Sequence, residues 1–184
     1  YAVGGVSVGE ADYTKAMMKK LGDVAFWKIA MRPGRPMAVG QINRDKLASS
    51  PYYISADSST FYSSSNASTI LFGLPGNPVA VMVTFLAFVR PALLRMMGCT
   101  PSATPLLKAR SAEPIRKKPG RTEYQRGIVS TASDGSLQVK ITGNQGSGVL
   151  SSMVQANGLI VLHHSQGNVA AGDLVDVMMF DGAI

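Results

Sequence analysis

The sequence predicts an α/β domain followed by a small all-β, barrel-like domain. In the first hundred residues, short apolar runs typical of buried strands alternate with helical patterns, as in α/β folds. After Thr100 and Pro101 the pattern changes to short β-type runs separated by glycine and Asp-Gly turns, which is typical of all-β domains. We therefore expect one domain over residues 1–100 and a second over residues 101–184.

The composition indicates a globular protein. Of the 184 residues, 46% are hydrophobic and only 16% are charged, which is too apolar for a disordered chain. The longest apolar run, residues 79–94, is interrupted by Thr84, Arg90 and Pro91, so we expect no membrane span. The single cysteine, Cys99, cannot form an internal disulfide, which fits a cytoplasmic location.

Hydrophobic spacing and turn residues place the elements of the first domain. A helix is expected over residues 12–21, after a glycine-rich turn, and a serine-rich insertion over residues 43–69. Three apolar runs are expected to form strands of a parallel sheet: residues 24–31, 37–42 and 70–72.

A long helix is expected over residues 79–97. Asn77 is a favoured N-cap residue, Pro78 suits the first helical turn, and Gly98 suits the position just past the end. Pro91 is expected to kink this helix. In the second domain, four runs are expected to be strands: residues 127–131, 137–141, 158–162 and 174–179.

The net charge of +7 is concentrated in one part of the chain. Residues 101–126 hold seven basic and two acidic side chains, most densely around Arg116, Lys117, Lys118 and Arg121. Three interpretations stay open: a solvated loop face, a pocket for a small anion, or a nucleic-acid surface. Tyr124 is the one aromatic residue in this segment, which disfavours a single-strand binder.

Two glycine-rich loops each precede a helix. The loop of residues 4–9 could hold a phosphate through backbone N–H groups and the Ser7 hydroxyl, or could be a tight structural turn. Asp12 beyond it could stabilise the helix dipole, hold Mg²⁺, or do both. The loop of residues 73–78 could bind a ligand at a strand end or simply cap the following helix.

A group of basic residues follows the first expected strand. Lys28 and Arg32 have the same parity, so both could project from one face of a strand that continues to Met31, with Arg35 across the turn. These cations could clamp an oxyanion, or Lys28 could be a solvated residue at a sheet edge. No pattern typical of a catalytic Ser, His or Cys is present.

Five motifs in this order resemble the molybdopterin molybdenumtransferase family (MoeA), which includes the gephyrin E-domain. The match covers nearly the whole chain outside the serine-rich insertion. The motifs are GGVSVGEADYTK (4–15), FWKIAMRPGRP (26–36), LPGNPVAV (74–81), KKPGRTEYQRG (117–127) and GNQGSG (143–148).

The resemblance implies a fold and a reaction. It implies that the α/β part is the later portion of a three-layer α/β/α molybdopterin-binding domain. It implies insertion of molybdate into adenylylated molybdopterin with Mg²⁺-dependent release of AMP, completing the molybdenum cofactor. It further implies a cytoplasmic homodimer, supplied with substrate by a molybdopterin adenylyltransferase and binding neither nucleic acid nor membrane. Since the family has further N-terminal domains and a cleft shared between subunits, we expect this chain alone to be inactive.

The resemblance also implies roles for individual residues. Asp12, Lys28 and Arg32 match residues of the family's catalytic site, with Asp12 serving Mg²⁺ or the pyrophosphate. Two departures from the family pattern are an alanine, Ala80, where a serine is usual, and Ala2-Val3, where a Ser/Thr pair is usual. The residues expected to bind the pterin phosphate or molybdate are Gly5, Ser7, Gly9, Arg35, Pro75, Gly76, Asn77, Pro78, Arg126 and Ser147. An alternative function is a gephyrin-type scaffold that binds a partner peptide.

Overall fold

The computed structural model divides the chain into two compact units. Unit 1 consists of Tyr1–Lys28 and Pro36–Gly76, and unit 2 of Ile29–Arg35 and Asn77–Ile184. The division expected at residue 100 follows a change of sequence pattern, whereas these units follow packing, so the expected domain boundary stays a prediction. The structure describes residues 2–4, 16, 18–20, 22–43, 68–100, 104–146 and 148–180.

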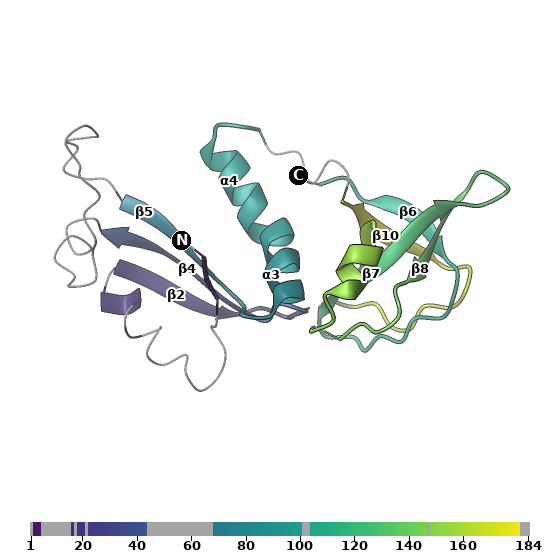
Figure 1. The fold of residues 1–184 in the computed structure, drawn as a ribbon, viewed down its shortest axis with the longest axis horizontal. Helices are drawn as coiled ribbons and strands as arrows, with labels where there is room; N and C mark the ends of the chain where they lie inside the picture. Colours follow the sequence, from purple (N-terminus) through teal and green to yellow (C-terminus); the bar gives the residue numbers. More distant parts are fainter. Residues whose placement is uncertain are drawn as a thin grey trace. The chain divides into compact units, whose positions relative to one another are not determined.

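Unit 1 contains a four-stranded sheet (Figure 1). Its strands, in spatial order, are β1 (Ala2–Gly4), β5 (Ser68–Leu74), β4 (Pro36–Asn43) and β2 (Gly22–Lys28). Val24, Ala38, Ile42 and Leu71 form its buried core together with Met18.

The expected parallel sheet is wrong for most of these pairs. Only β1 pairs in parallel, with β5, while β4 runs antiparallel to both β5 and β2. The short connection of residues 29–35 explains part of this, because parallel neighbours need a crossover of about a dozen residues or more. Of the helix expected over 12–21, the described residues 16 and 18–20 are helical.

Unit 2 contains a closed five-stranded barrel. Each strand pairs with two others in the ring β7–β8–β6–β10–β9–β7, which leaves no free edge. Its interior is aliphatic, with Val139, Ile160, Leu162 and Val177 almost fully buried. The strands are β6 (Leu107–Ser111), β7 (Thr122–Thr131), β8 (Leu137–Ile141), β9 (Gly158–Leu162) and β10 (Leu174–Met179). The predicted fold class, α/β followed by a small β-barrel, is confirmed.

Three of the four strands expected in this domain have the predicted bounds, and the fourth is the second half of β7. The basic segment 108–126 is not a loop throughout, because β6 and the first half of β7 lie within it. A two-residue strand, β3 (Met31–Arg32), pairs in parallel with the start of β7, and a short helix, α5 (Ser151–Gln155), precedes β9.

The helix that follows Asn77 begins and ends within one residue of the predicted bounds. It comprises α3 (Pro78–Thr84), a π-helical turn η1 (Phe85–Val89) and α4 (Arg90–Met96), which run as one rod in Figure 1. Asn77 Oδ1 accepts a hydrogen bond from the Val79 N–H at 3.2 Å, and Gly98 beyond the end has φ +81°.

The π-helical turn η1 explains how this helix accommodates Pro91. The Arg90 N–H donates to the Phe85 carbonyl, five residues earlier, instead of four. A proline has no N–H and its ring clashes with the carbonyl four residues before it, so a wider turn there relieves the clash. The helix thus has a π-helical turn just before Pro91, and the kink expected there stays a prediction.

The first part of this helix packs within unit 2. Val79 and Val83 are fully buried against Met31 and the barrel residues Leu159 and Val161. By length and composition alone, Pro78–Met96 could cross a membrane, the one described helix of that kind. The core helix of a soluble protein passes the same test, so the expected absence of a span stays a prediction.

Gly34 is required where the turn before β4 meets this helix. It has φ +100°, and a Cβ there would lie 2.5 Å from Thr84 Oγ1 and 3.3 Å from Met31 Cε. Gly135, in the turn between β7 and β8, has φ +82° but has no atom within 4 Å of such a Cβ. A substitution at either glycine strains the backbone, but only one at Gly34 also crowds neighbouring atoms. Comparing the two therefore separates these effects.

We expect Gly34→Ala to lower the free energy of unfolding more than Gly135→Ala. Both substitutions strain the backbone by about 1–3 kcal/mol, and only the first adds overpacking, typically about 1–3 kcal/mol. Urea unfolding followed by circular dichroism measures both. Equal losses would show that the contact with Thr84 is unimportant.

A cluster of three charged or titratable side chains links three parts of the barrel. Asp176 on β10 accepts from Lys108 Nζ on β6 at 2.7 Å and contacts His163 Nε2, just after β9, at 2.7 Å. Hydrogen bonds from Lys108 and then His163 hold the pKa of Asp176 below its usual value. A lowered carboxyl pKa stabilises the fold above the unfolded-state pKa, about 3.9, and this contribution is lost as the pH falls through the folded-state pKa.

We therefore expect Asp176→Asn to lower the melting temperature near pH 6 and to matter progressively less below about pH 4. Thermal unfolding of both proteins between pH 3 and 7, a window chosen around the usual Asp pKa of about 3.9, measures this. A gap in melting temperature that stayed constant over the whole range would contradict the assignment.

Candidate functional site

The predicted site residues fall into three groups. Five of them, Gly5, Ser7, Gly9, Asp12 and Ser147, lie outside the described residues, so their roles stay predictions. Lys28, Pro75 and Gly76 belong to unit 1. The members in unit 2 are Arg32, Arg35, Asn77, Pro78 and Arg126.

The expectation that Lys28 and Arg32 share one strand face is wrong. β2 ends at Lys28, and Arg32 belongs to β3, which pairs with β7 in the barrel sheet. The strand is interrupted because the Ile29 N–H donates to the Arg35 carbonyl at 2.8 Å and the Met31 N–H donates to the Ile29 carbonyl at 2.8 Å. Lys28 and Arg32 therefore belong to different strands and to different units.

Arg126, on β7, is a buried cation whose identified partners are neutral. Its side chain is 1% exposed, and in the described part of the chain no carboxylate forms an ion pair with it. Nε donates to Ser152 Oγ at 2.9 Å, and Nη2 donates to the carbonyls of Asn144 and Gly146 at 3.2 and 2.9 Å. The Nη1 group has no hydrogen-bond partner among the described residues, so its two N–H groups are available to a ligand.

Arg32 lies close enough to affect Arg126. Burial lowers the pKa of Arg126, and the positive charge of Arg32 lowers it further. A guanidinium nevertheless stays protonated in proteins. Two like charges are thus held near each other in unit 2 without a described carboxylate on either, which favours a bound anion.

The loop after β8 holds Arg126 in place. Gln145 Oε1 accepts from the Arg126 N–H at 2.8 Å, and Gln145 Nε2 donates to the Arg126 and Thr142 carbonyls at 3.1 and 2.5 Å. Ser152 Oγ, which accepts from Arg126 Nε, donates to the Val149 carbonyl at 2.6 Å. Sequence reasoning missed the roles of Gln145 and Ser152, although Gln145 stands inside the GNQGSG motif.

The start of α3 lies beside the same loop. A Cβ built on Gly148 would be 3.9 Å from Asn77 Nδ2, so the N-cap of α3 and the end of the loop are neighbours. Asn77 therefore lies beside the end of the loop whose earlier carbonyls, those of Asn144 and Gly146, accept from Arg126. Ala80, one turn further on, is buried, and its carbonyl accepts from Thr84 Oγ1 at 2.6 Å.

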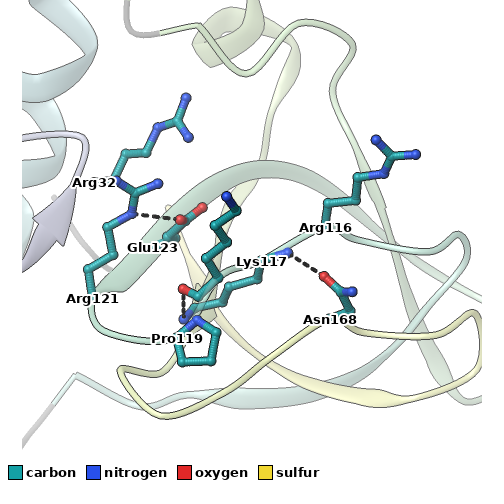
Figure 2. A pocket seen from close by; sticks show the side chains of 8 residues that line it. Arg32, Arg116, Lys117, Pro119, Arg121, Glu123 and Asn168 are labelled. Carbon is teal, nitrogen blue, oxygen red and sulfur yellow. Dashed lines mark hydrogen bonds and ion pairs between the residues drawn. The ribbon is translucent and has the colours of Figure 1, made fainter.

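Arg32 also lines a basic cavity of about 550 Å³. Figure 2 shows Arg32 and Arg121 at one side of it and Arg116 with Asn168 at the other. This cavity supports the interpretation of segment 108–126 as a pocket for a small anion. We call it the Lys117 pocket; it is lined by Arg32, Arg116, Lys117, Lys118, Pro119, Arg121, Glu123 and Asn168.

The described residues do not fit a magnesium ion. Among them, no three His, Cys, Asp or Glu side chains lie together as a metal site requires. Mg²⁺ prefers carboxylate and water oxygens, whereas the described members of the site include four basic residues and no carboxylate. We therefore derive no step through magnesium, and its placement at Asp12 rests on the resemblance.

Two protein-family models match the chain in succession. The model of the probable molybdopterin binding domain matches residues 2–95, and that of the MoeA C-terminal region (domain IV) matches residues 108–180.

Curated relatives agree with these matches. The molybdopterin molybdenumtransferase of Haemophilus influenzae is 36% identical over 97% of this chain and 38% of its own length. The gephyrin of Dictyostelium discoideum is 30% identical over 96% of this chain and 24% of its own length. The chain thus spans only 24% to 38% of the length of these relatives.

A solved structure shares the fold. A molybdopterin biosynthesis MoeA protein from Pyrococcus horikosii aligns with a TM-score of 0.64 and 22% identity, over 97% of this chain and 36% of that one. Because the first family model alone covers more than half of the residues, the chain belongs to the family of probable molybdopterin binding domains, here followed by a MoeA C-terminal region.

Proposed function

We propose that this chain forms part of a molybdopterin molybdenumtransferase, which inserts molybdate into adenylyl-molybdopterin and releases AMP. The observation that carries the proposal is the buried Arg126, with unassigned Nη1 donors and the charge of Arg32 nearby. Membership of the molybdopterin-binding family supports the choice of substrate.

The substrates explain why the site is basic. Molybdate is a dianion, and the pyrophosphate link of adenylyl-molybdopterin is also negatively charged. Bringing them together is opposed by Coulomb repulsion, which is stronger in a partly desolvated site than in water. Arg126 and Arg32 offset that repulsion, because fixed cations need no reorganisation during the reaction.

The chain's own residues bind and orient the reactants. We assign molybdate to the Nη1 side of Arg126, beside the N-cap of α3 and the Gly143–Gly148 loop. A guanidinium presents its N–H groups in a fixed plane, which suits the oxygens of an oxyanion. Transfer of molybdenum to the dithiolene sulfurs is ligand exchange, so positioning matters more than a general base.

The remaining parts of the proposal rest on the resemblance. They are a phosphate-binding role for Gly5, Ser7 and Gly9, a molybdate contact from Ser147, and Mg²⁺ at Asp12. They also include a cytoplasmic homodimer, a molybdopterin adenylyltransferase as the donor of substrate, and the absence of nucleic-acid and membrane partners. Lys28 and Arg35 are assigned to the substrate's phosphates, and Pro75 and Gly76 to the cleft wall.

We expect Arg126→Ala in the full-length protein to lower molybdate-dependent AMP release about 100-fold or more, the usual loss when one donor to a developing or bound oxyanion is removed. Arg126→Lys keeps the charge but loses the hydrogen bond to Ser152 and the planar donors, so we expect a raised KM for molybdate. Asp12→Ala is expected to be inactive.

The matched control is Lys140→Gln, which removes an exposed charge from β8 and is expected to leave the rate unchanged. Circular dichroism and melting temperature verify that each variant is folded. Wild-type turnover in Arg126→Ala would overturn the site assignment. Wild-type turnover in Asp12→Ala would show that Asp12 is not part of the site.

Gln145 is proposed as a positioning residue. Gln145→Glu keeps an acceptor for the Arg126 N–H but loses the donor to the Thr142 carbonyl and adds a negative charge beside the anion site. We expect KM for molybdate to rise more than kcat falls, with Gln145→Ala showing a smaller rise. If the two variants had the same KM, the electrostatic part of this role would be excluded.

A further inference from the structure

The Lys117 pocket is separate from the Arg126 donors and shares only Arg32 with the residues assigned above. Five of its eight lining residues belong to the loop from Arg116 to Arg121, which precedes β7. The loop is fixed by backbone pairing at both ends: Ile115 pairs with Val169, and the Gly120 N–H donates to the His164 carbonyl at 2.9 Å. The cavity is thus part of the barrel's framework.

Lys117 is the unusual residue of this pocket. It is only 4% exposed, and its Nζ donates to the carbonyls of Gln166 and Lys118 at 2.9 and 3.3 Å. Its backbone N–H donates to Asn168 Oδ1 at 2.9 Å (Figure 2). No carboxylate pairs with it in the described ranges. Burying an ammonium without a counter-charge is costly, and one of its three N–H groups is left for a ligand.

The other charges of the pocket do not neutralise Lys117. Glu123, the one carboxylate among the described lining residues, is buried and accepts hydrogen bonds from Arg121 Nε at 2.8 Å and Gln125 Nε2 at 3.4 Å. Arg32, Arg116 and Lys118 form no ion pair with any described carboxylate. Four cationic residues, these three and Lys117, therefore line the cavity without a described counter-charge.

We propose that the Lys117 pocket binds a small-molecule phosphate, with two linked phosphate groups as its best ligand. A cavity of about 550 Å³ exceeds what one phosphate fills, and it lies within the range of about 300–1,000 Å³ typical of small-ligand sites. A pyrophosphate group carries enough negative charge to match the four cations. The described lining residues include no aromatic side chain, which disfavours stacking of nucleic-acid bases.

This site goes beyond the proposed reaction, because binding here requires neither molybdate nor turnover. The phosphate could come from an adenylylated substrate, from AMP, or from free pyrophosphate, since all present the same chemistry. A direct binding measurement on the whole chain therefore tests it independently of enzyme activity.

The experiment is isothermal titration calorimetry of the chain with sodium pyrophosphate, AMP and orthophosphate, at fixed near-physiological ionic strength without added magnesium. The test variant is Arg116→Gln with Lys118→Gln, two exposed side chains. The matched control is Arg95→Gln with Lys140→Gln, which removes the same charge from α4 and β8 of the same unit.

We expect saturable one-to-one binding of pyrophosphate that the test variant weakens at least tenfold and the control changes less than twofold. Binding of AMP as tight as pyrophosphate would point to a nucleotide as the source, and weaker AMP binding to a pyrophosphate group. As a second variant, Lys117→Arg keeps the buried charge but changes its shape, and is expected to weaken binding while the melting temperature falls only slightly.

Three results would overturn the proposal. One is the absence of saturable binding by any of the three anions. Another is equal weakening by the test and control variants, which would indicate a diffuse charge effect. The third is binding of a single-stranded oligonucleotide, with steep salt dependence, that pyrophosphate does not displace.

Discussion

The burial of Arg126 is the constraint on which the candidate site in unit 2 depends. The Arg126 guanidinium is only 1% exposed and stays protonated. The fold must therefore surround its positive charge with hydrogen-bond acceptors in place of water. It does so with the Asn144 and Gly146 carbonyls and the Ser152 hydroxyl, all within 3.2 Å. The loop between β8 and α5 is shaped by this requirement, and the side chain in turn ties that loop to β7.

Strand β7, which contains Arg126, connects the candidate site to the rest of unit 2. Its ten residues pair with β3, β8 and β9, so it is both a barrel strand and the partner of Met31–Arg32. Glu123 near its start holds Arg121, and Arg126 near its middle holds the loop after β8. One strand therefore fixes the Lys117 pocket and the Arg126 site relative to each other within unit 2, with Arg32 affecting both.

How far the sequence could predict the structure depended on where polar residues are buried. The apolar alternation of residues 137–141 and 174–179 and the apolar run of residues 158–162 were sufficient, and these strands have the predicted bounds. The first half of β7 was missed because Glu123 and Arg126 occupy buried positions and mask the alternation. The local signals at Asn77 and Gly98 placed a helix correctly, since capping depends on neighbouring residues. Gln145 and Ser152 act across 19 and 26 residues, and no local pattern encodes such contacts.

The uneven charge of the chain agrees with the two proposed anion-binding regions. Residues 127–184 carry one basic and four acidic side chains, so the barrel's later strands do not extend the positive surface. A continuous stripe, as a nucleic-acid surface requires, is therefore not formed by the second half of the barrel. Cations held together without counter-charges repel one another and lower the stability of the empty protein. An anion that binds the folded form alone reverses this loss by mass action. If the two proposed sites bind anions, ligand binding and folding stability are coupled at Lys117 and Arg126, the two buried cations of unit 2 for which the described residues provide no carboxylate partner.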